Sequence, residues 1–216
     1  MNLIPASHIL TFCSAMVDSG PPFRLLRNID NELPDRLSSG KDIDILVRWQ
    51  DSEKLEKWMP QAGFHRTPHP FQNEKFLYGV HPFRFYRNNN APFIIDCHFE
   101  LACRSLNKGE WIPLDQTIQS QAWTSCGYHL VDGLHIPGLN PVCEWIHLLT
   151  RCVFDKRRFE KGYIRRIDHL MARLNETEML EISRLVFFKF SMSLLALLQT
   201  GRYTEIIREH LHFTDY

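Results

Sequence analysis

Apolar and polar residues follow two different patterns along this chain, and the change falls near residue 138. Before it, short β-rich runs alternate with turns, whereas after it apolar residues recur at helical spacing almost to the end. The run from Val142 to Val153 places its apolar residues at i, i+3, i+4 and i+7, which predicts an amphipathic helix. We therefore expect an α+β fold, with a small mixed β-sheet and flanking helices over residues 1–138 and a helical bundle over residues 139–216.

The remaining elements follow from local start, stop and alternation signals. Strong strand patterns cover residues 42–49 (DIDILVRW) and 93–101 (FIIDCHFEL). Asn175, with Glu178 three residues later, forms a capping box that predicts a third helix of the second half, long and apolar and ending at Gly201. The other expected elements are helices over 7–17, 52–59, 160–174 and 203–211, a strand over 23–27, and a hairpin made of 75–80 and 83–86.

The two strong strands carry carboxylates on one face only. Successive strand residues point to opposite faces, so Asp42 and Asp44 share one face with Leu46. The opposite face is apolar and carries Ile43, Ile45 and Val47. Asp96 lies on the corresponding polar face of residues 93–101, and His98 follows it two residues later. If the two strands are neighbours, their axes lie about 4.8 Å apart, and three carboxylates converge on one patch of the sheet.

Three converging carboxylates either raise each other's pKa or need a cation. Magnesium is the natural partner because it is a hard ion that prefers oxygen ligands, and paired ions can clamp the attacking and leaving oxygens of a phosphoryl displacement. The pattern therefore predicts metal-assisted chemistry on a phosphate. The alternative is structural: Asp42 caps a turn after Gly40, Asp44 pairs with an arginine, and Asp96 ends a strand.

Composition narrows the class of protein. The chain has 216 residues, of which 44% are apolar and 23% charged, and these values fit a soluble globular protein rather than a disordered, collagen-like or coiled-coil chain. Lysine plus arginine and aspartate plus glutamate both number 25, so no global field attracts nucleic acid or an anionic membrane. We therefore do not expect nucleic acid as a partner.

Signals of membrane insertion and secretion are weak. Residues 185–198 form an apolar run that is shorter than the roughly 18 residues of a membrane span and contains Lys189. The first residues have no basic region and no clear cleavage site, so we expect no signal peptide. Six cysteines without a CxxC pair are too sparse for a disulfide scaffold, which indicates reduced thiols in a cytoplasmic protein.

Residues 23–101 resemble the nucleotidyltransferase superfamily of the DNA polymerase β type. The family pattern is a hydrophobic strand, a Gly-Ser turn, an acidic strand with two carboxylates two residues apart, and a third aspartate on a later strand. The resemblance is closest to a bacterial uncharacterised branch with DIDLLV and VDLH strands, which read DIDILV at Asp42–Val47 and IDCH at Ile95–His98 here. The helical second half resembles the helical tail of many members more loosely.

This resemblance implies a reaction and roles for the three aspartates. Asp42 and Asp44 would hold the metal bound to the triphosphate, and Asp96 would join them at the catalytic metal and help to deprotonate the acceptor. The cofactor would be Mg²⁺ or Mn²⁺. The enzyme would move a nucleoside monophosphate from a nucleoside triphosphate such as ATP to a hydroxyl of a small molecule or glycan, in the setting of polysaccharide biosynthesis.

One position departs from the family pattern. Where the family has its Gly-Ser turn, this chain has Arg27 and Asn28; asparagine adopts turn conformations readily, and an arginine can hold a phosphate bidentately. Further candidate nucleotide contacts are Ser39 and Lys41, before the first acidic strand, and Lys156 and Tyr163, in the basic stretch of the helical half. The structural alternatives are a solvated turn for the first pair and a solvated helix face for the second.

Two other functions stay open. The LicD/fukutin-like phosphotransferases carry a similar Asp-Ile-Asp strand and move a phosphoalcohol from a CDP-linked donor onto a glycan. A degenerate nucleotidyltransferase fold could instead serve as a binding or antitoxin-like module, which the replaced Gly-Ser turn favours. An enzyme predicts an open cleft with three carboxylates within metal-bridging distance, whereas a degenerate module predicts carboxylates paired with arginines, or a filled cleft.

Overall fold

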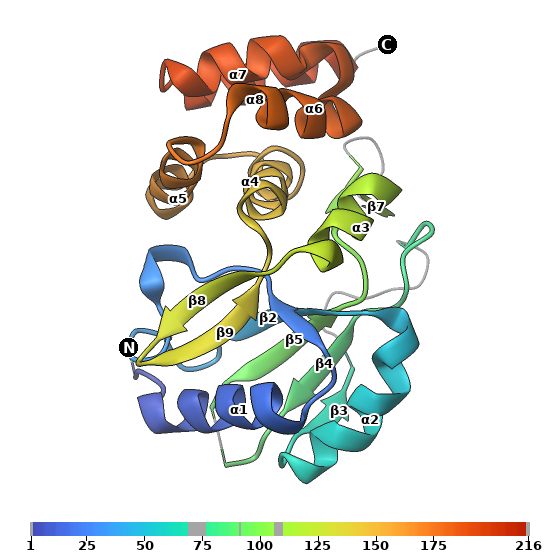
Figure 1. Cartoon of the computed structure of the whole chain (residues 1–216), viewed down its shortest axis with the longest axis vertical. Helices are drawn as coiled ribbons and strands as arrows, with labels where there is room; N and C mark the ends of the chain where they lie inside the picture. Colours follow the sequence, from blue (N-terminus) through green and yellow to red (C-terminus); the bar gives the residue numbers. More distant parts are fainter. Residues whose placement is uncertain (1, 69–76, 91, 106–109, 215–216) are drawn as a thin grey trace.

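The computed structural model describes residues 2–68, 77–90, 92–105 and 110–214, with side chains described as far as residue 209. Within these residues it contains a mixed seven-stranded sheet in the order β3-β4-β5-β2-β1-β9-β8 and a separate sheet of β6 and β7. The helices of the second half stack on one side of the large sheet, in the upper part of Figure 1. The expected α+β architecture with a helical C-terminal half is confirmed.

The strands are β1 Phe23–Leu25, β2 Asp42–Val47, β3 His65–Thr67, β4 Arg84–Arg87, β5 Ile94–His98, β6 Ala102–Arg104, β7 Trp111–Pro113, β8 Gly127–Val131 and β9 Leu134–Gly138. The helices are α1 Ala6–Ser19, α2 Ser52–Gln61, α3 Gln116–Thr124, α4 Pro141–Thr150, α5 Lys161–Met171, α6 Glu176–Phe187, α7 Ser191–Gln199 and α8 Tyr203–Thr214. Short helical turns are η1 Ile29–Asn31, η2 Trp49–Asp51, η4 Arg151–Asp155 and η5 Phe188–Phe190.

The apolar face of β2 and β5 forms one of the two main hydrophobic cores. Ile43 and Ile45 of β2 are buried there among side chains of α1 and α2, such as Phe12 and Leu55. These two helices lie along the same side of the sheet, at the bottom of Figure 1. Burial of this face fixes the opposite face of both strands as the one that carries the carboxylates, because strand side chains alternate.

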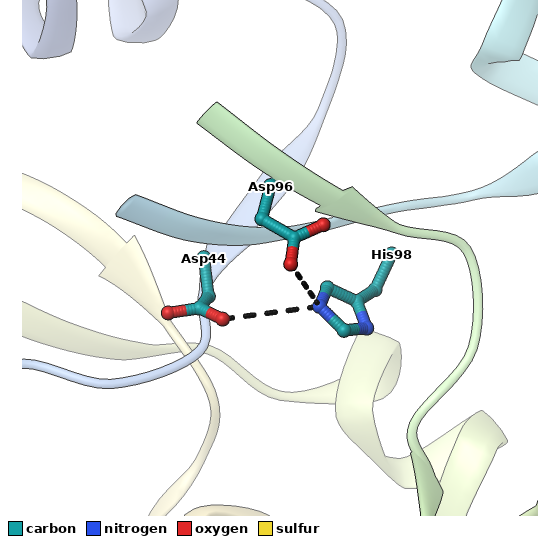
Figure 2. Close-up of side chains that lie close together, drawn as sticks. All are labelled: Asp44, Asp96 and His98. Carbon is teal, nitrogen blue, oxygen red and sulfur yellow. Dashed lines mark ion pairs between the residues drawn. The ribbon is translucent and has the colours of Figure 1, made fainter. Parts of the chain in front are cut away.

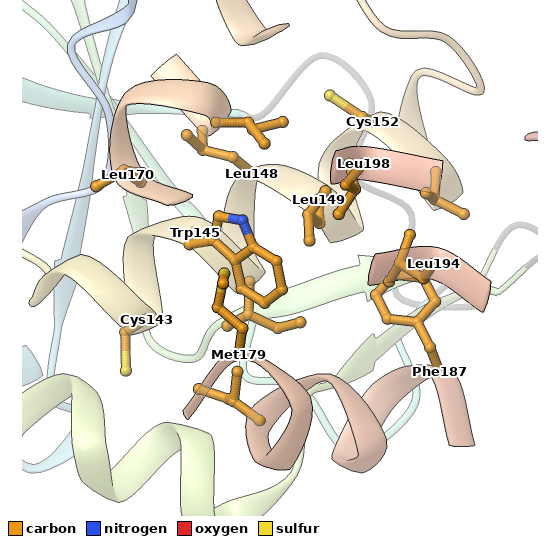
Figure 3. Close-up of a cluster of buried hydrophobic side chains, with 14 of the residues drawn as sticks. Cys143, Trp145, Leu148, Leu149, Cys152, Leu170, Met179, Phe187, Leu194 and Leu198 are labelled. Carbon is orange, nitrogen blue, oxygen red and sulfur yellow. The ribbon is translucent and has the colours of Figure 1, made fainter. Parts of the chain in front are cut away.

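The second core surrounds α4 and holds the helical half together (Figure 3). Trp145 and Leu148 of α4 are completely buried and belong to one cluster with residues of α5, α6 and α7. The same cluster includes Leu26 and Leu46 from the sheet, so apolar contacts continue across residue 138. A division into separate domains at this residue stays a prediction.

The predicted long apolar helix is two helices. The Asn175 side chain accepts a hydrogen bond from the Glu178 amide at 2.8 Å and caps the start of α6, as its capping box predicts. However, Phe188 takes a φ of +48°, and the turn η5 follows before α7 begins. The break lets α7 pack against α6, and both helices bury apolar side chains in the core around α4.

Two other expectations need correction. The predicted hairpin of residues 75–80 and 83–86 is not present in the described residues: β4 pairs with β3 and β5, whereas Leu77 bridges Trp111, and residues 75–76 lie outside the described range. Helix α3 was not expected, although the Asp115 side chain caps it by accepting from the Thr117 amide at 2.7 Å. No helix among the described residues is long and apolar enough to cross a membrane.

Candidate functional site

The two acidic strands lie side by side. Strands β2 and β5 pair in parallel, and the register places Asp44 directly opposite Asp96. The apolar side chains of both strands are buried on the far face, as the alternation predicts. The sequence pattern therefore brings two of its three carboxylates together on one face through ordinary sheet pairing.

Asp44, Asp96 and His98 form a compact buried cluster (Figure 2). Their ligand atoms all lie within 4.8 Å of one another. The Nε2 atom of His98 lies 3.5 Å from Oδ2 of Asp96 and 3.8 Å from Oδ1 of Asp44. The three residues are only 5–8% exposed, so the charges have little water to stabilise them. Two carboxylates and an imidazole in this arrangement are a donor set suited to a divalent cation.

Arg27 supplies a positive charge at the edge of this cluster. It follows β1 in the chain, and its Nη2 atom lies 2.7 Å from Oδ2 of Asp44. Burial by itself lowers the pKa of Arg27, but the neighbouring acidic groups, Asp44 first among them, together outweigh this effect and the net pKa is raised. Arg27 therefore stays charged, and one of the two oxygens of Asp44 is engaged by an arginine.

Burial and neighbouring carboxylates shift the pKa of Asp42 in the same direction, whereas they act in opposite directions on the pKa of His98. The pKa of Asp42 is raised, first by burial and then by the neighbouring charge of Asp44, while Arg27 reduces the effect. Burial by itself lowers the pKa of His98, but the carboxylates of Asp96 and Asp44 outweigh it, and its pKa is raised overall. Neighbouring negative charge contributes to both shifts, after burial for Asp42 and against burial for His98, and an added cation would relieve this charge.

A cavity of about 310 Å³ opens beside Asp44 and lies between the sheet and the helical half. It is lined by most of the site residues predicted from the sequence, although they come from distant parts of the chain. Ser39 and Asp96 do not line this cavity as far as the structure describes it; the Ser39 amide instead donates to the carbonyl of Asn2 at 2.8 Å. The nominated residues on the lining are Arg27, Asn28, Lys41, Asp42, Asp44, Lys156 and Tyr163.

The cavity is more acidic than the sequence suggests. Its lining contains three cationic side chains and five acidic ones. Lys41 lies 2.8 Å from Glu32, and Lys156 lies 3.4 Å from Glu160 and 5.1 Å above the Tyr163 ring. The acidic residues that sequence reasoning missed on this lining are Asp30, Glu32 and Glu160. An anionic ligand would meet net repulsion here unless it arrived with a cation.

The turn η1 holds the two walls of the cavity together. The carboxylate of Asp30 accepts hydrogen bonds from Nη2 and Nε of Arg165 in α5, at 2.5 and 3.2 Å. The side chain of Asn28 accepts from the Leu33 amide at 3.1 Å, which fixes the chain just before and after this turn. Nothing in the local sequence marks these contacts, because Asp30 and Arg165 are separated by most of the chain.

Comparisons with known proteins give no match at the level of sequence: no protein-family model and no curated protein matches the chain. Among solved structures, the lincomycin-bound lincosamide antibiotic adenylyltransferase LnuA is 12% identical, with a TM-score of 0.47 over 80% of this chain and 100% of that chain. The solution structure of the antibiotic-resistance factor ANT(2'')-Ia is 11% identical, with a TM-score of 0.48 over 91% and 96% of the two chains.

A second ANT(2'')-Ia structure, in complex with adenylyl-2''-tobramycin, is 11% identical, with a TM-score of 0.48 over 83% of this chain and 93% of that chain. All three are distant similarities of overall chain arrangement. What the present protein can do chemically depends on its own carboxylates, its cavity and the charges around them.

Proposed function

We propose that this protein is a metal-dependent nucleotidyltransferase that moves a nucleoside monophosphate from a nucleoside triphosphate to a hydroxyl of a small molecule or glycan. One observation carries the proposal: Asp44 lies directly opposite Asp96 on the neighbouring parallel strand, and it lines a cavity together with Asp42 and basic side chains from both halves of the chain. This arrangement combines a cation site with room for a phosphorylated ligand.

The residues at the site fit a divalent cation. Asp42, Asp44 and Asp96 offer the carboxylate oxygens that Mg²⁺ and Mn²⁺ prefer, and their charges are only partly balanced by Arg27. When bound, the cation would neutralise phosphate charge and polarise the phosphoryl group. The excess of acidic over basic side chains on the cavity lining supports this requirement, because a bare triphosphate would be repelled.

The remaining residues have roles that follow from where they lie. Lys41 and Lys156 reach the cavity from opposite walls and would exchange their carboxylate partners for phosphate oxygens. Asp96, opposite Asp44 on the neighbouring strand, would accept the proton of the acceptor hydroxyl. The acceptor oxygen would then form a bond to the α-phosphorus while the bond to the β-phosphate oxygen breaks, which releases pyrophosphate.

The cellular setting is also part of the proposal. All six cysteines are free, and five of them are buried. Burial raises the pKa of several of these thiols, including Cys143 to about 11, so they are unreactive at neutral pH. Free buried thiols suit a reducing cytoplasm, where nucleoside triphosphates are also present.

A second candidate function has one specific observation in its favour. The ion pair between Arg27 and Asp44 is what a degenerate, non-catalytic binding module predicts, since an arginine there replaces a metal as the counter-charge. The open cavity and the proximity of Asp96 favour the enzyme instead. The two functions differ in whether a triphosphate binds and whether a divalent cation is needed.

Isothermal titration calorimetry with ATP, CTP, GTP and UTP, each with and without MgCl₂, tests the proposal. We expect at least one triphosphate to bind only when magnesium is present, and binding to fall at least about tenfold when Asp42→Asn is combined with Asp44→Asn. Asp51→Asn is the matched control, because Asp51 is another buried carboxylate that lies at the start of α2 and pairs with Lys54 outside the cavity.

Failure of all four triphosphates to bind the folded protein would contradict the nucleotidyltransferase function. CDP-linked donors are then the next ligands to titrate, because the phosphotransferase alternative uses them and requires the same aspartates. Binding of a triphosphate that is equally strong without magnesium and in the double variant would favour a binding module.

A further inference from the structure

His98 stands out among the polar residues of the site because its ring is held rigidly and its outer nitrogen faces two carboxylates. Strand alternation places it on the same face of β5 as Asp96, two residues away, and diagonally across from Asp44 on β2. Its ring packs against the Phe83 ring with centroids 4.6 Å apart, and the residue is only 5% exposed. The orientation of the imidazole is therefore set by packing.

The Nε2 atom of His98 lacks an ordinary hydrogen-bond partner within the described part of the chain. It points toward Asp96 and Asp44, as Figure 2 shows, but at 3.5 and 3.8 Å these contacts are longer than normal hydrogen bonds. A buried polar atom without a partner is costly, so its direction toward two carboxylates calls for an occupant between them.

The spacing of these atoms suits a shared ion. Two ligand atoms that each lie about 2.1 Å from one cation are separated by about 3 Å at a right angle and by at most about 4.2 Å when opposite. The two distances from the imidazole nitrogen, 3.5 and 3.8 Å, fall inside this window. A direct hydrogen bond would instead have drawn the nitrogen to about 2.8 Å from one carboxylate.

We propose that His98 is a nitrogen ligand of the cation held by Asp44 and Asp96, so that this site takes a first-row transition-metal dication such as Mn²⁺ in preference to Mg²⁺. The inference rests on the proposed function, because it specifies the cation of the same site. Mg²⁺ favours all-oxygen coordination and gives up its water reluctantly, whereas imidazole is a good ligand for transition metals. One nitrogen among carboxylates therefore shifts selectivity without weakening the site.

The test uses the whole protein without nucleotide and Mn²⁺ as the probe. Pulsed electron paramagnetic resonance of the bound Mn²⁺ reports whether a nitrogen nucleus is coordinated, independently of any activity. We expect a nitrogen signal that disappears in His98→Gln and persists in His147→Gln, the matched control, which is another buried histidine outside the cluster. Loss of Mn²⁺ binding in Asp44→Asn assigns the ion to this cluster.

Calorimetry on the same proteins measures the selectivity. We expect the wild-type protein to bind Mn²⁺ more tightly than Mg²⁺ by at least about tenfold, and His98→Gln to lose most of this preference while its Mg²⁺ affinity changes little. Should His98→Gln fail to fold, wild-type protein labelled with ¹⁵N only at histidine still tests nitrogen coordination, because the label changes the nitrogen frequencies in the paramagnetic resonance spectrum when a histidine is bound to Mn²⁺.

The outcomes separate the two proposals. Mn²⁺ that binds, is lost in Asp44→Asn, and shows no nitrogen coupling would overturn the role of His98 and leave the metal site of the proposed function in place. Equal affinities for Mn²⁺ and Mg²⁺ would overturn the selectivity. Absence of Mn²⁺ binding to the wild-type protein would overturn the inference, and magnesium-dependent triphosphate binding would still decide the proposed function separately.

Discussion

Asp44 has a role in both candidate functions, as a metal ligand in the enzyme and as the partner of an arginine in the binding module. It pairs with Arg27 at 2.7 Å, lies opposite Asp96 in the sheet, and faces the cavity that contains Asp42. Its position on the polar face of β2 was predictable from strand alternation alone, and so was pairing with an arginine as a structural alternative. Which arginine, and that His98 would join the cluster, depends on packing between strands.

Lys156 carries a prediction at this same scale. Replacing it by methionine keeps most of the apolar stem but removes the charge that reaches the cavity beside Tyr163. A hydrogen bond to a charged phosphate contributes about 1.5–3 kcal/mol, so we expect the dissociation constant for the bound triphosphate to rise about 10- to 100-fold in calorimetry.

Lys57→Met is the control for this change, because Lys57 is exposed on α2 and does not line the cavity. Equal affinities in the two variants would show that Lys156 belongs only to the solvated helix surface and its ion pair with Glu160.

The secondary-structure elements were predictable to different degrees. Strands β2 and β5 and the start of α6 carry strong local signals, and the structure has them where the patterns place them. The break at Phe188 carries no glycine or proline to announce it, although aromatic and β-branched residues just before it have modest helix propensity. The break allows α6 and α7 to contribute apolar side chains to the same core. The periodicity of the sequence carries no information about this tertiary packing.

Contact between α5 and η1 gives a prediction at the scale of elements. A Cβ atom added to Gly162 would lie 2.8 Å from Cγ2 of Ile29 and closer still to the carboxylate of Asp30. We expect Gly162→Ala to lower the free energy of unfolding by about 1–2 kcal/mol. Moving η1 away from α5 to make room for the methyl group costs about 1–3 kcal/mol, and the higher helix propensity of alanine offsets up to about 1 kcal/mol of this.

Urea denaturation checks this value. Lys161→Ala is the control, because Lys161 precedes Gly162 in the same helix and its side chain is exposed. If Gly162→Ala were as stable as the control, the close approach of η1 and α5 would not hold in solution, and the wall of the cavity would have to be placed differently.

At the scale of the whole molecule, the two halves of the chain meet over a polar layer as well as an apolar one. His147 projects from α4 and is 2% exposed, and neither of its ring nitrogens has a hydrogen-bond partner within the described residues. Burial first, and then the charges of Arg151, Arg27 and His98, lower its pKa well below the usual value. His147 is therefore neutral in the folded protein.

This neutral histidine makes stability depend on pH. Below its unfolded pKa of about 6.5, His147 binds a proton in the unfolded chain but not in the folded one, so its contribution is complete above that pH and is lost as the pH falls. We expect the free energy of unfolding to drop by about 1.4 kcal/mol per pH unit from this group alone between about pH 6 and 5.

Urea denaturation of wild-type protein and His147→Leu over this range isolates the effect. The variant removes the titrating group while leaving the other histidines, so the free energy of unfolding of the wild-type protein minus that of the variant should fall as the pH falls. Curves that stay parallel would mean that His147 takes up a proton in the folded state as readily as in the unfolded chain.

The sequence by itself determined the α+β class, the helical second half, and the polar face that carries Asp42, Asp44 and Asp96, because periodicity and strand alternation are local properties of the chain. Only the tertiary structure decided that β2 and β5 are neighbours, that acidic side chains outnumber basic ones around the cavity, and that Arg27 and His98 contact the carboxylates. These features depend on contacts between residues far apart in the chain, and their energies become defined only when burial brings the groups together and removes water.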